Sequence, residues 1–269
     1  MKVSTWLIPP LKPTTQDSFA SIDIAVVIDV LRATTVATTA LAAGASQILT
    51  TNEIETAHQL ARDNPSSDGR PALLCGERQC RPIEGFDLGN SPGEYSPAGV
   101  AGRTCVLTTT NGTRAIQAAV NAKHVLLGCF ANLTAVIDQL AASQNGDQNP
   151  HIGLVCSGTN GEVTTEDVLA AGAIIGLLHQ RLADTPRFYD GPIEPANDST
   201  SIALATWQHA LTGEAVSDAE SLAAKLSTTK GGRNLIAAGY ESDLTDCASI
   251  DVFDVVPQRI AGTTNAFAL

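Results

Sequence analysis

The stretch Ile24-Ala-Val-Val-Ile-Asp-Val-Leu31 reads as a buried strand, and Ala33-Thr-Thr-Val-Ala-Thr-Thr-Ala-Leu-Ala-Ala43 follows it as a helix of small side chains. A short, nearly unbroken apolar run is typical of a strand that is covered on both faces. Gly44 stands directly after the helical pattern, where glycine commonly ends a helix. This strand-then-helix unit predicts an α/β fold.

The same alternation continues along most of the chain. Further strands are predicted at 47–50, 73–75, 104–108, 124–129, 151–156 and 252–256. Further helices are predicted at 53–63, 165–181, 199–212, 218–226 and 232–239, with one more after residue 108 and another that carries Leu133, Val136, Ile137 and Leu140. The pattern favours a mostly parallel sheet covered by helices. The polar residues 143–150 leave two arrangements open: a single unit over residues 1–269, and two α/β lobes divided near 143–150 with the site between them.

The composition excludes several classes of function. The chain has 269 residues, a net charge of −12 and no basic run. A nucleic-acid partner is therefore not expected, because neutralising phosphates requires clustered Lys and Arg. No membrane span is expected either, since the longest apolar helical run, Val168–Leu178, is too short to cross a bilayer. A small polyanionic substrate would be repelled at long range, so it would need a local positive pocket or a bound cation.

The cysteines and the N-terminus indicate the compartment. The six cysteines are scattered and form no C-x-x-C pair. Free thiols in a reducing cytoplasm are the simplest interpretation. The N-terminus shows no apolar h-region before Pro9 and Pro10, so no signal peptide is expected. We therefore expect a cytoplasmic protein.

Residues 76–92, Gly76-Glu-Arg-Gln-Cys-Arg-Pro-Ile-Glu-Gly-Phe-Asp-Leu-Gly-Asn-Ser-Pro92, show neither helical nor strand periodicity. A connection this long is usually a lid or a binding loop when it is ordered. Its own apolar residues should keep it ordered, namely Ile83, Phe86 and Leu88. Its polar residues include Glu77, Arg78 and Asn90. Hard oxygen donors suit Mg²⁺ better than zinc, so this loop is predicted to hold a metal and an anion together.

The first strand ends in an acid. Asp29 interrupts an apolar run, and a buried carboxylate needs a partner, a metal or a raised pKa. Arg32 could pair with Asp29 or with a bound anion. A purely structural Asp29–Arg32 pair at the start of the helix is the alternative.

Three other strand ends carry polar residues. After the strand 104–108, Thr108-Thr-Thr-Asn-Gly-Thr-Arg114 would present hydroxyl and N–H groups to an anion, with ordinary helix capping as the alternative. Cys156 precedes a glycine loop, but Glu162 stands where cysteine phosphatases need an arginine. Glu166 and Asp167 begin the next helix, where they would bind a metal or complement the helix dipole. The segment Thr229–Leu235, with two glycines before Arg233, is a weaker anion-binding pattern.

Taken in order, these motifs resemble the 2-phosphosulfolactate phosphatase family. The resemblance runs through Val27–Thr35, Gly76–Arg78, Gly85–Pro92, Thr108–Thr113, Cys156–Gly158 with Glu166-Asp167, and Gly231–Leu235. It implies a family-specific α/β fold and a Mg²⁺-dependent phosphoric monoester hydrolase that converts 2-phospho-3-sulfolactate, or related 2-hydroxy acid phosphates, to 3-sulfolactate and phosphate. In some organisms this reaction feeds coenzyme M synthesis. One departure is visible, since Gln79-Cys80-Arg81 stands where small glycines are usual.

The motifs and the resemblance together define the predicted site. The predicted catalytic residues are Asp29, Arg32, Glu77, Cys156 and Asp167, and the predicted metal ligands are Asp29, Glu77 and Asp167. The predicted substrate-binding residues are Arg78, Asn90, Asn111, Gly112, Thr113, Arg114, Ser157, Gly158 and Arg233.

Several points stay open at the level of sequence. The nucleophile could be water, Asp29 or Cys156. A non-catalytic organophosphate-binding or regulatory protein and a Mg²⁺-dependent phosphotransferase are the alternative functions. A homo-oligomer also stays open.

Overall fold

The computed structural model describes residues 1–10, 19–144, 149–183, 193–212 and 218–269. Its strands are β1 (Lys2–Trp6), β2 (Ile24–Ile28), β3 (Gln47–Thr51), β4 (Leu73–Arg78), β5 (Arg81–Pro82), β6 (Thr104–Thr108), β7 (His124–Gly128), β8 (His151–Cys156), β9 (Glu194–Pro195), β10 (Gln258–Arg259) and β11 (Ala266–Ala268). Its helices are α1 (Ala33–Ala42), α2 (Ile54–Asp63), α3 (Pro97–Val100), α4 (Gly112–Ala118), α5 (Leu133–Ala142), α6 (Thr165–Ala183), α7 (Asp198–Thr212), α8 (Ala219–Ser227), α9 (Lys230–Ala238) and α10 (Ser242–Ala248).

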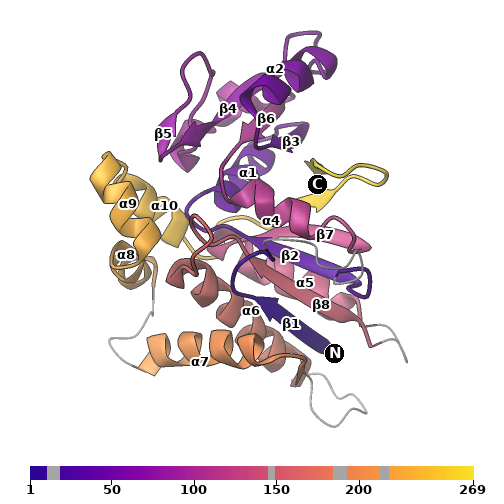
Figure 1. Ribbon diagram of the computed structural model, residues 1–269, viewed down its shortest axis with the longest axis vertical. Helices are drawn as coiled ribbons and strands as arrows, with labels where there is room; N and C mark the ends of the chain where they lie inside the picture. Colours follow the sequence, from indigo (N-terminus) through magenta and orange to yellow (C-terminus); the bar gives the residue numbers. More distant parts are fainter. Residues whose placement is uncertain (11–18, 145–148, 184–192, 213–217) are drawn as a thin grey trace.

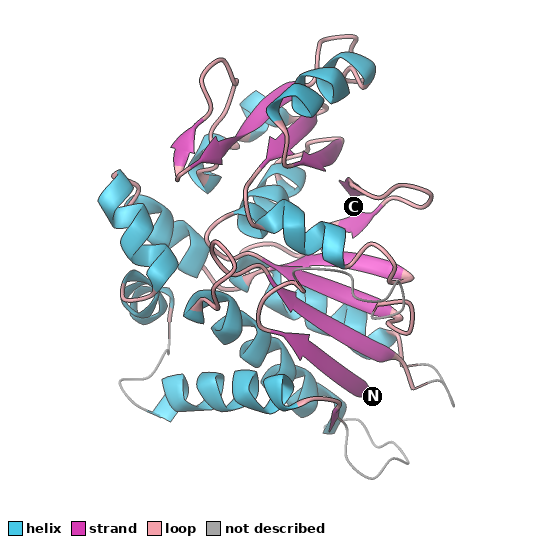
Figure 2. Cartoon of the chain, in the orientation of Figure 1, coloured by secondary structure: helices cyan, strands magenta, loops and turns pink. Residues whose placement is uncertain are grey.

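The strands form one open sheet in the order β5-β4-β6-β3-β11-β10-β7-β2-β8-β1-β9. The strands β4, β6 and β3 run parallel to one another, and so do β7, β2, β8, β1 and β9. The antiparallel hairpin of β10 and β11 joins these two parallel blocks. The prediction of a mostly parallel sheet covered by helices is therefore confirmed (Figure 1, Figure 2).

The central strand β2 shows why the sheet must be covered on both faces. Its side chains alternate, so that Val26 and Ile28 enter one hydrophobic cluster while Ala25 and Val27 enter another. The first cluster includes α5 and α6, and the second includes α1 and α4. All five residues of β2 are buried. Burying an aliphatic side chain of this size stabilises the fold by about 1.5–3 kcal/mol, so both layers contribute.

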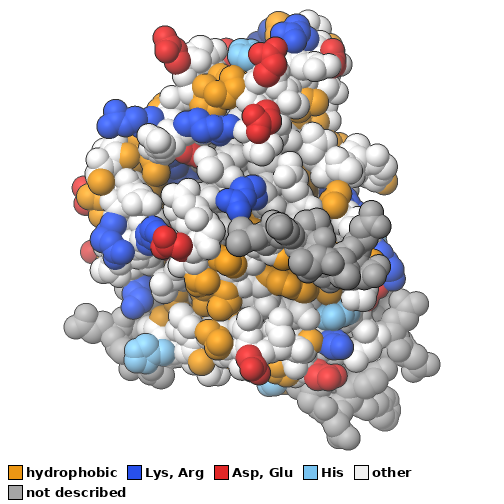
Figure 3. Space-filling model, in the orientation of Figure 1, with side chains coloured by type: hydrophobic (Ala, Val, Ile, Leu, Met, Phe, Trp, Pro, Cys, Tyr) orange, Lys and Arg blue, Asp and Glu red, His pale blue; other side chains and the backbone are white. Residues whose placement is uncertain are grey.

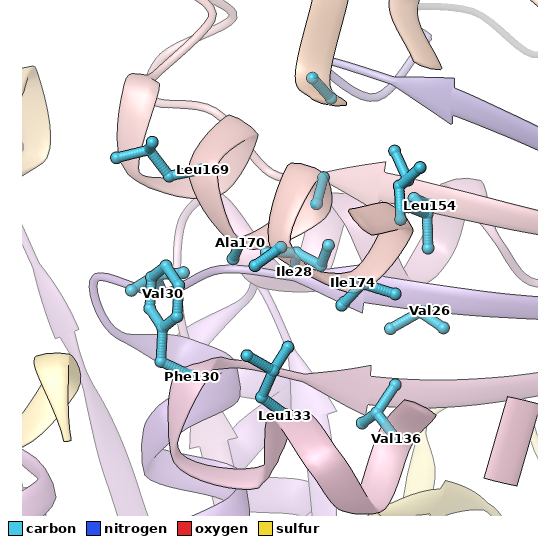
Figure 4. Close-up of a cluster of buried hydrophobic side chains, with 14 of the residues drawn as sticks. Val26, Ile28, Val30, Phe130, Leu133, Val136, Leu154, Leu169, Ala170 and Ile174 are labelled. Atoms are coloured by element: carbon cyan, nitrogen blue, oxygen red, sulfur yellow. The ribbon is translucent and has the colours of Figure 1, made fainter. Parts of the chain in front are cut away.

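Figure 4 shows the cluster on the α5 and α6 side of the sheet. Ile28 and Val26 lie between Ile174 of α6 and Leu133 and Val136 of α5. The helical face predicted from the spacing of Leu133, Val136, Ile137 and Leu140 is buried throughout, which confirms it.

Most predicted elements are confirmed with small shifts at their ends. The strands predicted at 104–108 and 151–156 match β6 and β8. The helix predicted from Ala33 ends as expected, because Gly44 adopts a left-handed conformation with φ of 93°. The strand predicted to reach Leu31 ends at Ile28, since the chain turns at Asp29 and the Thr34 N–H bonds to the Asp29 carbonyl at 3.0 Å.

Three expectations were wrong. Residues 252–256 form no strand, and Val252 is 55% exposed. The helix predicted at 232–239 begins earlier, at Lys230, so that Gly231 lies inside α9, because Thr229 caps the helix by accepting a hydrogen bond from the Gly232 N–H at 3.1 Å. The segment 76–92 is not wholly irregular, since β4 continues to Arg78 and pairs with β5. The sequence analysis also assigned no element to β1 or α10.

The prediction about the span between β7 and β8 falls partly on residues that are not described. Residues 145–148 lie outside the described part of the chain. The strands on the two sides of this span, β7 and β8, both pair with β2. No helix among the described residues is long and apolar enough to cross a membrane.

The hairpin of β4 and β5 explains the unusual residues at its tip. Arg78 pairs with Arg81, so the loop has the two residues Gln79 and Cys80, with φ values of 54° and 65°. Two-residue loops in which both residues have positive φ favour Gly or Asn. Side chains of other types are strained there. The glycines that are usual at this position would relieve the strain.

We expect Gln79→Asn to stabilise the protein by about 0.5–1 kcal/mol, because asparagine tolerates a left-handed backbone better than glutamine. For a chain of this length the melting temperature should rise by about 1–4 °C, measured by calorimetry. Gln59→Asn, at an exposed position in α2, is the matched control and should lower stability slightly. Equal effects of the two substitutions would contradict the turn assignment.

Candidate active site

A pocket lies where strands of both parallel blocks end, and we call it the strand-end pocket. It is lined by Asp29, Leu31, Arg32, Glu77, Cys80, Asn90, Thr109, Asn111, Thr159, Gly231, Asn234 and Leu235. The carboxyl ends of β2 and β8 point toward α9 and α10, as Figure 1 shows. Ligands of parallel sheets bind at such ends. The structure thus brings five predicted site residues together in one pocket, namely Asp29, Arg32, Glu77, Asn90 and Asn111.

Asp29 is the buried acid at the end of β2, and it is only 6% exposed. Its Oδ1 accepts a hydrogen bond from the Ala33 N–H at 3.3 Å. Its Oδ2 lies against Gly112, where a Cβ atom would stand 2.7 Å away, so this position requires glycine. Burial, together with the neighbouring carboxylates of Glu77 and Glu166, raises the pKa of Asp29 to about 7.

Arg32 does not form the predicted structural pair with Asp29. Its Nη1 donates instead to the carboxylate of Asp243 on α10, and both side chains are buried. Asp29 has no ion-pair partner among the described residues. The structural alternative for Asp29 and Arg32 is therefore wrong, and Asp29 faces the pocket without a compensating cation.

Glu77 is held by main-chain donors of two segments. Its Oε2 accepts from the Cys80 N–H at 2.8 Å, and its Oε1 accepts from the N–H and the hydroxyl of Thr110, both at 3.3 Å. Asn90 lies on the same pocket wall, and its Oδ1 is buried without a hydrogen-bond partner in the described structure. A buried carbonyl oxygen without a partner is uncommon, and a bound group could satisfy it.

Asp167 forms hydrogen bonds with the residues that follow β2 and β8, next to the pocket. Its Oδ1 accepts from the Val30 N–H at 2.9 Å. Its Oδ2 accepts from the Ser157 hydroxyl at 2.9 Å and from the Gly158 N–H at 3.0 Å. Burial, with Asp29 and Glu166 nearby, raises the pKa of Asp167 well above its usual range. The predicted residues Asp167, Ser157 and Gly158 thus contact one another but do not line the strand-end pocket.

Cys156 is fully buried at the end of β8 and belongs to the hydrophobic cluster between β2 and α6. Burial, with the carboxylates of Asp167 and Glu166, raises the pKa of its thiol well above the usual range. A thiol must ionise to act as a nucleophile. The environment of Cys156 is that of a structural cysteine. All six cysteines of the chain are free thiols.

The other predicted arginines lie outside the pocket lining. Arg78 donates to the carbonyl groups of Glu77 and Asn52, and Arg233 donates to the carbonyl group of Thr228. Figure 3 shows Lys and Arg side chains on the side of the molecule where α9 and the β4–β5 hairpin lie, at the left of the view. Among the residues that line the strand-end pocket, Arg32 is the only cation.

The turn before α4 is ordered by its own hydroxyl groups. The Thr113 N–H donates to the Thr109 hydroxyl at 3.3 Å, and the Thr113 hydroxyl donates to the Thr51 carbonyl at 3.3 Å. Asn111 accepts from the Asn160 N–H at 3.1 Å, which joins this turn to the loop after β8. Asn111 and Thr109 line the pocket, whereas Gly112, Thr113 and Arg114 are not among its lining residues.

The donor set of the pocket fits Mg²⁺. No three His, Cys, Asp or Glu side chains within the described ranges are grouped so that they could hold a metal by themselves. The predicted trio of Asp29, Glu77 and Asp167 is therefore not a preformed three-carboxylate site. Proteins commonly bind Mg²⁺ through one or two carboxylates, with water and substrate phosphate completing the shell. Asp29, Glu77 and the unpartnered oxygen of Asn90 meet that description.

Sequence reasoning missed several residues of the site. The pocket also includes Cys80, Thr109, Thr159, Gly231 and Asn234, and Arg32 is held from outside by Ser91, Tyr240 and Asp243. Most of these residues stand near a recognised motif. Asp243 had no such signal, because it lies in a helix that was not predicted.

Comparison with known proteins gives a consistent match. The profile of a family described as 2-phosphosulpholactate phosphatase matches residues 11–261. A protein of Caldanaerobacter subterraneus named "Probable 2-phosphosulfolactate phosphatase" is 37% identical over 236 residues, which cover 87% of this chain and 86% of the relative. Proteins of the same name from Thermotoga maritima and Prochlorococcus marinus are 36% and 38% identical, each over 88% of this chain and 89% of the relative.

We expect Asp29→Asn to stabilise the metal-free protein in a pH-dependent way. The pKa of Asp29 is about 7 in the folded state and near the ordinary 3.8 when unfolded. The folded state therefore holds a proton that the unfolded state has lost, and stability falls as the pH rises from about 4 to about 7. Asparagine does not titrate, so the variant does not lose stability in this pH range. The increase in unfolding free energy relative to the wild type should therefore be about 2–3 kcal/mol larger at pH 8 than at pH 5.

Urea unfolding in EDTA at the two pH values measures this difference. Asp63→Asn, at an exposed position of α2, is the control and should act equally at both pH values. A gain for Asp29→Asn that does not change with pH would refute the raised pKa.

Proposed function

Because the chain belongs to the 2-phosphosulfolactate phosphatase family, we propose that it is a phosphoric monoester hydrolase that uses Mg²⁺ to release phosphate from 2-phospho-3-sulfolactate and related 2-hydroxy acid phosphates. The observation that carries this proposal is the meeting of Asp29, Glu77 and the unpartnered oxygen of Asn90 with the guanidinium of Arg32 in one pocket. Carboxylates beside an arginine suit a phosphate ester together with a divalent cation.

The charges in the pocket support the need for a cation. Asp29 and Glu77 bring two acidic groups, and the charge of Arg32 is already balanced by Asp243. A polyanionic ester would meet a neutral or negative site there. Mg²⁺, held by Asp29, Glu77 and Asn90, would neutralise phosphoryl oxygens when it is bound.

The side chains of the pocket would then have separate roles in the reaction. Arg32, which lines the pocket, would bind oxygens of the substrate. Asp29, which contacts Ala33 and Gly112, would either orient an attacking water or attack the phosphorus itself as the ester bond to the alcohol breaks. The main-chain donors that hold Glu77 keep its carboxylate in place. Phosphoryl transfer depends mainly on such positioning and on charge stabilisation.

The cellular setting is part of the same proposal. Free thiols at all six cysteines fit a reducing cytoplasm. The product 3-sulfolactate would be available to coenzyme M synthesis in an organism that makes this coenzyme.

Phosphate release tests the function directly. The purified protein is incubated with racemic phosphosulfolactate or phospholactate, in Mg²⁺ or in EDTA. We expect Mg²⁺-dependent release that favours the sulfonated ester. Glu77→Gln should lower turnover on the order of 10²-fold because it removes one of the two carboxylates proposed to hold Mg²⁺, and with it charge stabilisation of the phosphoryl group. The matched control Glu84→Gln, an exposed glutamate of the same segment, should keep normal turnover. A folded protein that binds both esters and releases no phosphate would instead be an organophosphate-binding protein.

Replacing Cys156 separates the candidate nucleophiles. We expect Cys156→Ala to keep turnover within about threefold of the wild type, because a buried thiol with a raised pKa supplies no thiolate. Phosphate release and the melting temperature are measured together. A loss of several orders of magnitude without a change in melting temperature would identify Cys156 as the nucleophile.

A further inference from the structure

Arg32 is held in an unusual way for a residue that faces a ligand pocket. Its Nη1 donates to the carboxylate of Asp243 and to the Ser91 hydroxyl, the latter at 3.2 Å. Its Nη2 donates to the Cys80 carbonyl at 3.1 Å, and its guanidinium lies 4.8 Å from the ring centre of Tyr240. The Ser91 hydroxyl in turn donates to Asp243 at 2.8 Å. Groups from α10, the residues before it and the long loop therefore fix one edge of the guanidinium.

The opposite edge of the guanidinium makes no hydrogen bond to the described residues. Arginine carries five N–H donors, and three of those of Arg32 have the partners just described. The N–H of Nε and the second N–H of Nη2 have no partner within the described residues. These two donors belong to neighbouring nitrogen atoms, which is the arrangement that binds a phosphate or carboxylate with two parallel hydrogen bonds. Because Arg32 lines the strand-end pocket, this edge is the one left for a ligand.

A contribution to folding stability does not by itself explain the buried Arg32–Asp243 ion pair. The side chains of Arg32 and Asp243 are only 2% and 5% exposed. Removing two charges from water is costly, and apolar residues of similar size often replace such a pair without loss of stability. A buried pair next to a pocket is better explained by the direction that it gives to the guanidinium.

We propose that Asp243 is a positioning residue of the phosphatase, which holds Arg32 so that its Nε and Nη2 edge binds an anionic group of the substrate. The proposal rests on the proposed function and names the residue that orients its arginine. Asp243 acts through Arg32 and does not itself touch the substrate. Ser91 supports the same edge, since it bonds to both partners. The three C-terminal helices α8–α10, which lie beside the strand ends in Figure 1, thereby contribute to the site.

The test compares Asp243→Asn in the wild-type protein and in Arg32→Lys. Asparagine keeps the size of the side chain and removes its charge. We expect Asp243→Asn to lower kcat/KM about tenfold or more, with a larger effect on KM than on kcat, because a charge-assisted hydrogen bond to the substrate is misaligned. In Arg32→Lys the same substitution should change kcat/KM less than about twofold, since the group that it orients is gone.

Matched variants separate positioning from general damage. Asp246→Asn, at an exposed aspartate one turn along α10, should leave kcat/KM unchanged. Ser91→Ala is the milder variant, and it decides the matter if Asp243→Asn does not fold. We expect it to lower kcat/KM about threefold, again only when Arg32 is present. Equal losses in the wild-type and Arg32→Lys proteins, or normal kinetics of Asp243→Asn, would overturn the proposal.

Binding of inorganic phosphate distinguishes this proposal from the function on which it rests. Phosphate with Mg²⁺ should raise the melting temperature of the wild type, and this rise should shrink in Asp243→Asn but not in Asp246→Asn. If the wild type releases no phosphate from the esters and the rise still depends on Asp243 through Arg32, the proposed reaction fails and the positioning role stands. If the wild type is active and the rise is the same in Asp243→Asn, the positioning role fails and the reaction stands.

Discussion

The structure depends on one costly constraint, the burial of the Asp29 carboxylate at the end of the central strand. The strand β2 is covered on both faces, so its last side chains leave water completely. An apolar residue at position 29 would satisfy the core without desolvating a charge. The chain instead keeps the acid, raises its pKa and places it against one main-chain donor, the Ala33 N–H, and a glycine.

The three acids near the strand ends serve different purposes, although their residue types are nearly the same. Asp29 faces the pocket and has few partners. Asp167 accepts hydrogen bonds from the loop after β8 and from the turn after β2, so it ties the start of α6 to two strand ends. Glu166 lies against Gly231 of α9, and its Oε2 has no hydrogen-bond partner within the described ranges. Burial raises the pKa of all three, but only the first can reach a ligand in the strand-end pocket.

The sequence predicts the parts of this molecule that are local in character. The alternation of strands with helices and the spacing of Leu133, Val136 and Ile137 can both be read from the periodicity of apolar residues within short segments. The structure confirms both. The convergence of Asp29, Glu77 and Asn111 was also predictable, because residues at the carboxyl ends of parallel strands lie near one another. The hairpin tip at Gln79 and Cys80 was visible only as a departure from the family pattern, since neither residue is typical of a tight turn.

Long-range pairing could not be predicted in the same way. Arg32 and Asp243 are separated by 211 positions, and no periodic pattern marks either as the partner of the other. For the same reason, Asp29, which is close in sequence, was considered as a partner of Arg32 alongside a bound anion, and Asp243 was not. The false strand at 252–256 has a related cause, because apolar residues alone do not show whether a neighbouring strand has a free edge for pairing.

The balance of charge explains how an acidic protein can hold an anionic ester. A net charge of −12 disfavours the approach of a polyanion. The strand-end pocket does not reverse this by gathering arginines, since Arg78 and Arg233 donate to carbonyl groups outside it and Arg32 is balanced by Asp243. Recognition of the ester must then depend more on the orientation of the hydrogen-bond donors than on net positive charge. An arginine fixed along one edge offers few but well-aligned donors, and in the proposed function the two acids would attract the cation that makes the pocket acceptable to a phosphate group. In such a site a poorly oriented arginine would be nearly as harmful as a missing one.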